Sequence, residues 1–156
     1  VCQDNEQAIA YGKGMALLLQ HLLVGLELPA AARAAVGALA SAGPAEGVVA
    51  GKIGAALAAR NQPVQAATLA FGQSCPLAGS FPAALQAALA HEDDFIAAIL
   101  ATARAGGDNA ARAAMIGAWL GARHGLEAVP AAWRERLTAR DTISRDVARL
   151  LATVAA

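Results

Sequence analysis

Apolar residues recur along most of this chain at the spacing of three and four that is typical of an amphipathic helix. The first segment, from about Asn5 to Leu26, shows the pattern at Ile9, Ala16 and Leu19. No stretch alternates apolar and polar residues over the length that indicates a β-strand. We therefore expect an all-α fold, a compact bundle of about eight helices in a single domain.

Proline, glycine and capping residues divide this pattern into segments. Asp4 or Asn5 is expected to cap the first helix, and Ser80 to cap a helix with Pro82 in its first turn. Residues 71–79 are expected to form a loop between helices. The remaining predicted helices lie at about 30–42, 44–60, 64–70, 93–104, 109–124, 130–137 and 142–153.

The helix predicted at 109–124 has two further expected features. Ala113, Gly117 and Gly121 recur every four residues, so this face should form a smooth groove for a closely packed helix. His124 and Gly125 are expected to cap its C-terminal end.

Composition excludes some classes of function. The chain has 156 residues, of which 57% are hydrophobic and 15% charged, and its formal net charge is zero. Zero net charge gives no electrostatic reason to expect nucleic acid or an anionic membrane as a partner. No run approaches the roughly 18–20 apolar residues of a membrane span. Mean hydropathy is nevertheless +0.45, which predicts that the chain does not stay monomeric by itself.

The cysteines and the N-terminal sequence bear on cellular location. Cys2 and Cys75 provide neither a disulfide framework nor a metal-ligand cluster. The first residues lack the basic and apolar regions of a signal peptide, so we expect a cytoplasmic protein. The chain begins with Val1 rather than methionine, and we expect it to be a fragment or a processed product.

The strongest candidate for chemistry is the sequence Gly106-Gly107-Asp108-Asn109, followed by an alanine-rich helix. Two glycines allow a turn with positive φ and a close approach by another backbone or a ligand. Asp108 or Asn109 can cap the helix that follows. By itself, this pattern is explained either by a turn between two helices or by a ligand site.

The longer segment 95–137 favours a ligand site, because it resembles the C-terminal signature of the ADP-ribosylglycohydrolase family. Members typically have Gly-Gly-Asp-Thr-Asp-Thr, an alanine- and glycine-rich helix, a Gly-Ala-X-X-Gly element, and then Ile-Pro-X-X-Trp. The matching residues here are Gly106, Gly107, Asp108, Gly117, Gly121, Ala122, Gly125, Val129, Pro130 and Trp133. Segments 72–76 and 80–85 resemble, more weakly, the family members nearest the J1 crystallins.

This resemblance implies an all-helical domain of which residues 1–156 form the C-terminal part. The N-terminal half, in the same precursor or in another chain, would carry the other metal ligands. The implied activity is hydrolysis, with magnesium, of the glycosidic bond between ADP-ribose and a protein side chain or a small acceptor. The implied partners are thus ADP-ribose or an ADP-ribosylated substrate.

The resemblance also assigns site residues. Asp108 is the transferable metal ligand, and the implied ligand-binding residues are Gly72, Gln73, Ser74, Gly106, Gly107 and Asn109. The polar residues Gln3, Asp4 and Asn5 resemble a stretch near the ligand cleft, although helix capping explains them equally well. No catalytic residue is assigned.

One departure from the family pattern leaves the activity open. Ala110 and Ala111 occupy the positions of the second aspartate and the following threonine, which are magnesium ligands in the family. We therefore expect at most one weakly held ion from this chain. Three alternatives remain: a divergent hydrolase, a non-catalytic relative comparable to the J1 crystallins, and a helical interaction module. The sequence does not decide whether the protein is an enzyme.

Overall fold

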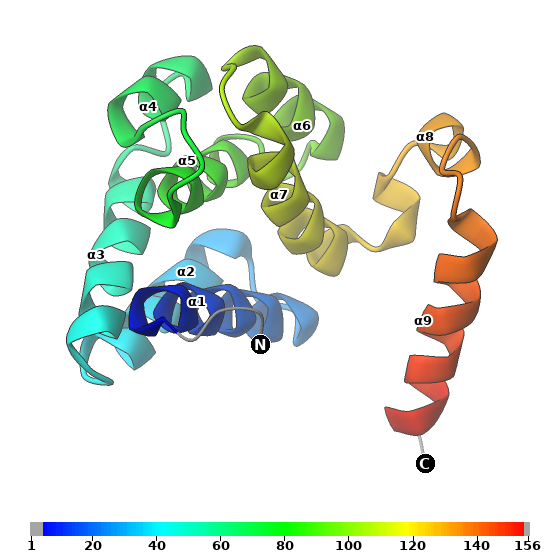
Figure 1. The fold of residues 1–156 in the computed structure, drawn as a ribbon, viewed down its shortest axis with the longest axis horizontal. Helices are drawn as coiled ribbons and strands as arrows, with labels where there is room; N and C mark the ends of the chain where they lie inside the picture. Colours follow the sequence, from blue (N-terminus) through cyan, green and yellow to red (C-terminus); the bar gives the residue numbers. More distant parts are fainter. Residues whose placement is uncertain (1–4, 155–156) are drawn as a thin grey trace.

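The computed structural model describes residues 5–154, and all regular structure in this range is helical (Figure 1). The α-helices are α1 (Glu6–Leu23), α2 (Leu28–Ala40), α3 (Pro44–Ala58), α4 (Val64–Phe71), α5 (Leu77–Ala90), α6 (Phe95–Arg104), α7 (Asn109–His124), α8 (Ala131–Glu135) and α9 (Arg140–Val154), with a short 3₁₀ turn, η1 (Leu126–Ala128). The all-α prediction is confirmed. Over the described range there are nine α-helices rather than about eight. Gln3 and Asp4 lie outside the described residues.

Polar side chains cap the starts of α1 and α6, and the cap of α1 by Asn5 is one that the sequence predicted. The carboxamide of Asn5 accepts a hydrogen bond from the amide of Ala8 at 3.1 Å and caps α1. Asp94 caps α6 in the same way, accepting from the amide of Ala97 at 2.8 Å. Each cap satisfies an amide that has no partner within its helix.

The C-terminal end of α7 also follows the prediction in part. Gly125 ends the helix with φ +78°, a conformation that glycine adopts without strain. His124 instead contacts another segment, because its Nε2 lies 2.6 Å from the carbonyl oxygen of Glu92. This contact joins the end of α7 to the turn between α5 and α6.

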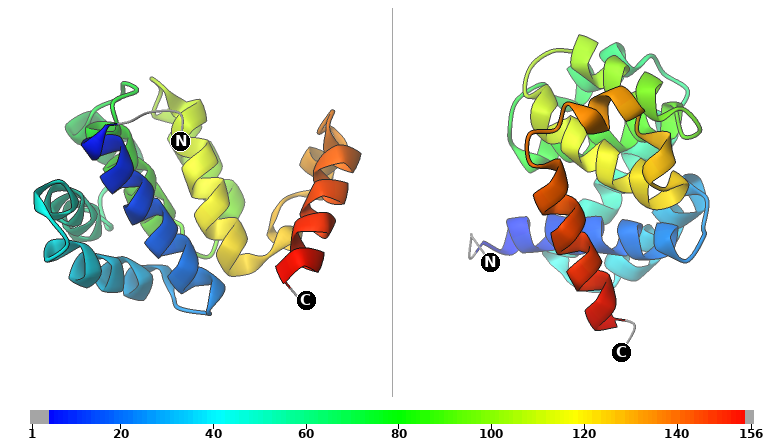
Figure 2. Two further views of the ribbon diagram at one scale, coloured as in Figure 1. Left: turned by 60° about the horizontal axis from the view of Figure 1, so that its bottom comes forward. Right: turned by 90° about the vertical axis from the view of Figure 1, so that its right-hand side faces the viewer.

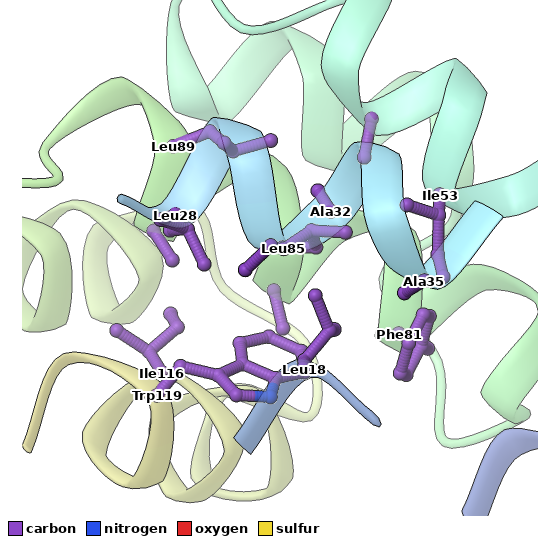
Figure 3. Close-up of a cluster of buried hydrophobic side chains, with 14 of the residues drawn as sticks. Leu18, Leu28, Ala32, Ala35, Ile53, Phe81, Leu85, Leu89, Ile116 and Trp119 are labelled. Atoms are coloured by element: carbon purple, nitrogen blue, oxygen red, sulfur yellow. The ribbon is translucent and has the colours of Figure 1, made fainter. Parts of the chain in front are cut away.

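Helix α5 is the centre of the fold. Every residue from Ser80 to Leu89 is buried, and the helix contacts α1, α3, α4, α6 and α7. A helix that is apolar on all sides can bury its side chains only when it is surrounded by other helices. Figure 3 shows Phe81, Leu85 and Leu89 of α5 among the side chains of the neighbouring helices.

Aromatic rings connect α1, α5 and α7 within this core. The ring centroids of Tyr11 and Phe81 are 5.3 Å apart, and those of Phe81 and Trp119 are 5.6 Å apart with an interplanar angle of 90°. An edge-to-face pair of this kind is favoured by the charge distribution of the rings. Gly14 allows α1 to approach α3 closely, because a β-carbon at this position would lie 2.9 Å from Cγ1 of Val49.

The start of α5 corrects the sequence prediction. The helix begins at Leu77 rather than Ser80, so the preceding loop is shorter, and Pro82 lies inside the helix. Pro76, with φ −52° and ψ 130°, occupies the capping position, and its carbonyl accepts from the amide of Ser80 at 3.0 Å. The buried Ser80 hydroxyl donates to the carbonyl of Cys75 at 3.3 Å instead of capping the helix.

The predicted groove on α7 is also wrong. A β-carbon at Gly121 would meet no atom of the described residues within 4 Å, and one at Gly117 would meet only the ring of Phe95 at 4.0 Å. The helix packs through a neighbouring face, which carries Ile116 and Trp119. The small residues lie beside this face, so they do not determine how closely another helix approaches.

Helices α8 and α9 stand apart from the bundle, as Figures 1 and 2 show. Trp133 in α8 lies 6.4 Å from the ring of Phe95, centroid to centroid, and remains 40% exposed. One face of α9 carries the exposed apolar residues Ile143, Val147, Leu150 and Leu151. Within the described range, no helix is both long enough and apolar enough to cross a membrane.

Candidate functional site

Two loops that are distant in the sequence meet at one end of the bundle. The loop 72–76 connects α4 to α5, and the loop 105–108 connects α6 to α7. The amide of Asp108 donates to the carbonyl of Gln73 at 2.8 Å, and the side-chain amide of Gln73 donates to the carbonyl of Ala105 at 2.6 Å. We call residues 72–76 and 105–109 the two-loop site.

Glycine is required where the loops touch. Gly106 and Gly107 have φ values of +73° and +66°, which place both in the left-handed region. A β-carbon at position 107 would lie 2.2 Å from the carbonyl oxygen of Gln73. The close approach expected of this glycine pair is therefore made by the backbone of the other loop.

The Asp108 side chain serves as the N-cap of α7. Its Oδ1 accepts from the amide of Ala111 at 3.4 Å. The Asp108 carboxylate, first as a hydrogen-bond acceptor and then through its charge, raises the pKa of the neighbouring Cys75 thiol. Asp108 of the 105–108 loop thus faces the 72–76 loop.

The remaining predicted residues lie around these contacts. Gly72 closes α4 with φ +120°, and Ser74 is exposed. The side-chain nitrogen of Asn109 donates to the carbonyl of Ala103 at 3.4 Å. The structure therefore brings all seven predicted site residues together in one region, although it assigns a role in binding to none of them.

Arg112 is the residue that sequence reasoning missed. Its side chain is fully buried beneath the 105–108 loop. The guanidinium donates from Nε to the Thr102 hydroxyl at 3.2 Å, from Nη1 to the Gln73 carbonyl at 3.3 Å, and from Nη2 to the Gly106 carbonyl. A helical projection of α7 could have located it, because Arg112 lies one turn before Ile116 on the buried face.

Comparison with known proteins identifies the family. The family profile described as ADP-ribosylglycohydrolase matches residues 2–156. The chain belongs to the ADP-ribosylglycohydrolase family.

Among curated relatives, crystallins J1A and J1B of Tripedalia cystophora are 36% and 35% identical to this ADP-ribosylglycohydrolase family member over 66 residues. Each match covers 42% of this chain and 20% of the crystallin. The chain thus aligns with about a fifth of the length of these relatives. No solved structure matches it significantly.

The donor set of the two-loop site does not fit the magnesium expected from the ADP-ribosylglycohydrolase resemblance. Magnesium requires oxygen ligands in near-octahedral geometry, and Asp108 is the one carboxylate in the two loops. That carboxylate already accepts the hydrogen bond that caps α7, and Ala110 and Ala111, at the positions where the resemblance implies further ligands, have no side-chain oxygen. Across residues 5–154, no three His, Cys, Asp or Glu side chains are grouped in a way that could hold a metal ion.

Proposed function

We propose that the two-loop site binds the ADP-ribose unit of an ADP-ribosylated protein or small molecule. The observation that carries this proposal is the junction between the loops, where Asp108 is held against the 72–76 loop in a member of the ADP-ribosylglycohydrolase family. A carboxylate that caps a helix N-terminus is already oriented, so it can accept hydrogen bonds from ribose hydroxyls at a small entropic cost. Ser74 and Asn109 add polar groups beside it.

Hydrolysis of the ADP-ribosyl linkage is the second candidate function. The family match favours it, and Asp108 is the carboxylate in these loops that could orient a water molecule. Ala110 and Ala111 provide neither a second carboxylate nor a hydroxyl. Binding is therefore the function that the geometry supports best, and cleavage would require groups beyond the two loops.

The test is calorimetric titration of ADP-ribose into the full chain, with ADP as the reference ligand. Asp108→Asn is the informative variant, because asparagine also caps helices well but removes the charge. We expect ADP-ribose binding in the wild type and a loss of about tenfold or more in this variant, the size expected for a hydrogen bond to a charged group.

Asp94→Asn is the matched control, since Asp94 caps α6 as Asp108 caps α7 but lies in another turn. It should bind ADP-ribose like the wild type. Equal binding by Asp108→Asn and the wild type, or no binding by the wild type, would refute the proposal. Release of free ADP-ribose from an ADP-ribosylated peptide, measured by chromatography, would establish the hydrolytic alternative.

A further inference from the structure

Arg112 is a buried cation with an unusual set of partners. Its three recorded hydrogen bonds go to a hydroxyl and two backbone carbonyls, and none goes to a carboxylate. The acceptors belong to three segments: Thr102 in α6, Gly106 in the 105–108 loop, and Gln73 in the 72–76 loop. A planar guanidinium can make such divergent bonds at once because its donors form a rigid fork.

The electrostatic environment shows why this cation matters for the site. Burial lowers the pKa of Arg112, while the nearby charge of Asp108 acts in the opposite direction. A buried charge is strongly unfavourable unless it is compensated, and the compensation here comes from carbonyl dipoles and Asp108. The site therefore already contains a positive charge adjacent to its single carboxylate, and a second cation would be repelled.

We infer that Arg112 holds the two loops together in this chain, a role that a bound divalent ion would otherwise have. ADP-ribose binding is therefore independent of magnesium. The guanidinium donates hydrogen bonds to oxygen atoms of both loops, where a metal ion would coordinate them, and it remains charged under all ordinary conditions. Arg112 is thus a positioning residue, which acts on the ligand through Asp108 and the 72–76 loop. The ligand part of this inference rests on the proposed function; the anchoring of the loops does not.

The first experiment measures the anchoring without any ligand. Amide hydrogen exchange, resolved by NMR, reports the hydrogen bond from the Asp108 amide to Gln73. Arg112→Met replaces the cation with an apolar chain and removes its three hydrogen bonds. Exchange at Asp108 should accelerate by about tenfold or more, whereas exchange at Ala98, whose amide bonds to Asp94 in another turn, should not change.

Two milder variants keep the test informative if Arg112→Met fails to fold. Arg112→Lys retains the charge but lacks the fork, so exchange at Asp108 should still accelerate. Thr102→Val removes one acceptor only and should have the smallest effect. Wild-type exchange in the Lys variant would overturn the inference that the fork joins the loops.

The second experiment compares magnesium chloride with EDTA. The wild-type melting temperature and ADP-ribose affinity should be the same in both, and ADP-ribose affinity should fall in Arg112→Lys. Magnesium-dependent melting or binding would overturn the inference. If the wild type fails to bind ADP-ribose in either condition, the proposed function fails, while the exchange and melting measurements still decide the role of Arg112.

Discussion

The carbonyl oxygen of Gln73 lies 2.2 Å from where a β-carbon would stand at Gly107. The same oxygen accepts hydrogen bonds from the Asp108 amide and from the Arg112 guanidinium. A single backbone atom therefore determines the glycine at 107, the orientation of the Asp108 backbone and the partner of a buried cation. A substitution at any of these positions should therefore alter the local structure at the other two.

Gly107→Ala should destabilise the protein and separate the loops. The added β-carbon would meet rigid backbone, and an L-residue at φ +66° is strained, so we expect a loss of about 1–3 kcal/mol or more in the free energy of unfolding. Gly121→Ala is the matched control, because its β-carbon enters open space inside α7 and should stabilise by about 0.5–1 kcal/mol. Urea unfolding followed by circular dichroism measures both. Equal stability of Gly107→Ala and the wild type would contradict the described contact.

The buried Gln86 side chain should be a second sensitive position. Its Nε2 donates to the carbonyls of Ala59 at 3.2 Å and Gln62 at 3.0 Å, where α3 ends. Gln86→Leu deprives both carbonyls of this donor, including the buried one of Ala59, and should cost about 1–3 kcal/mol. Gln65→Leu, on the exposed side of α4, should change stability by no more than about 0.5 kcal/mol. Thermal unfolding of the two variants tests the contrast, and similar melting temperatures would refute it.

The two tryptophans should respond differently to solvent and to truncation. Trp119 is fully buried against Phe81, whereas Trp133 is 40% exposed. Trp119→Ala should cost about 3–5 kcal/mol, and Trp133→Ala about 0.5–1.5 kcal/mol. Acrylamide should quench the fluorescence of Trp133, measured in Trp119→Phe, far more than that of Trp119, measured in Trp133→Phe. Equal quenching would mean that Trp133 is shielded from solvent as well as Trp119 is, which would contradict the described position of α8.

The ion pair between Lys13 and Glu46 predicts a pH dependence of stability. The hydrogen bond from Lys13 is the main cause that lowers the pKa of Glu46 below its usual value. A carboxylate with a lower pKa in the folded state stabilises the protein above its unfolded pKa, and this contribution disappears as the pH falls through the folded pKa.

Lys13→Met should therefore be less stable than the wild type near neutral pH, and the difference should shrink in acid. Lys52→Met serves as the control, because Lys52 makes no ion pair in the part of the chain that the structure describes. Its stability difference from the wild type should not vary with pH in this range. Urea unfolding at a series of pH values measures both differences, and a Lys13→Met difference that persists in acid would contradict the assignment.

Local signals in the sequence were sufficient to predict the helices and most of their ends. Asn5 and Gly125 act through the backbone of their own segment, so their roles can be seen from neighbouring residues alone. Ser80 was misassigned because Pro76 caps the helix earlier, and the two signals compete within five residues. The prediction of a groove along the glycines of α7 failed for a different reason, since spacing alone does not show which face another helix covers.

The partly predicted site shows the same division between local and distant information. The resemblance brought Asp108 and Gln73 into one site, and the structure joins them by a hydrogen bond. Arg112 and Gln86 were missed because each donates to a carbonyl oxygen of a distant segment, Gln73 for Arg112 and Ala59 for Gln86, and every residue type has a carbonyl oxygen. Only the three-dimensional arrangement shows which of these oxygens lies within reach of each buried side chain.

The complete burial of Ser80–Leu89 has a consequence for how this protein tolerates sequence change. In α1, substitutions should be accepted with a helical period, because buried positions such as Leu18 alternate with exposed ones such as Ile9. In α5, ten consecutive positions should resist polar replacement, including the alanines, whose small volumes set the distance to the surrounding helices. A saturation scan should therefore show a continuous intolerant segment that begins at Ser80, close to the 72–76 loop, so substitutions should be tolerated least near the candidate site.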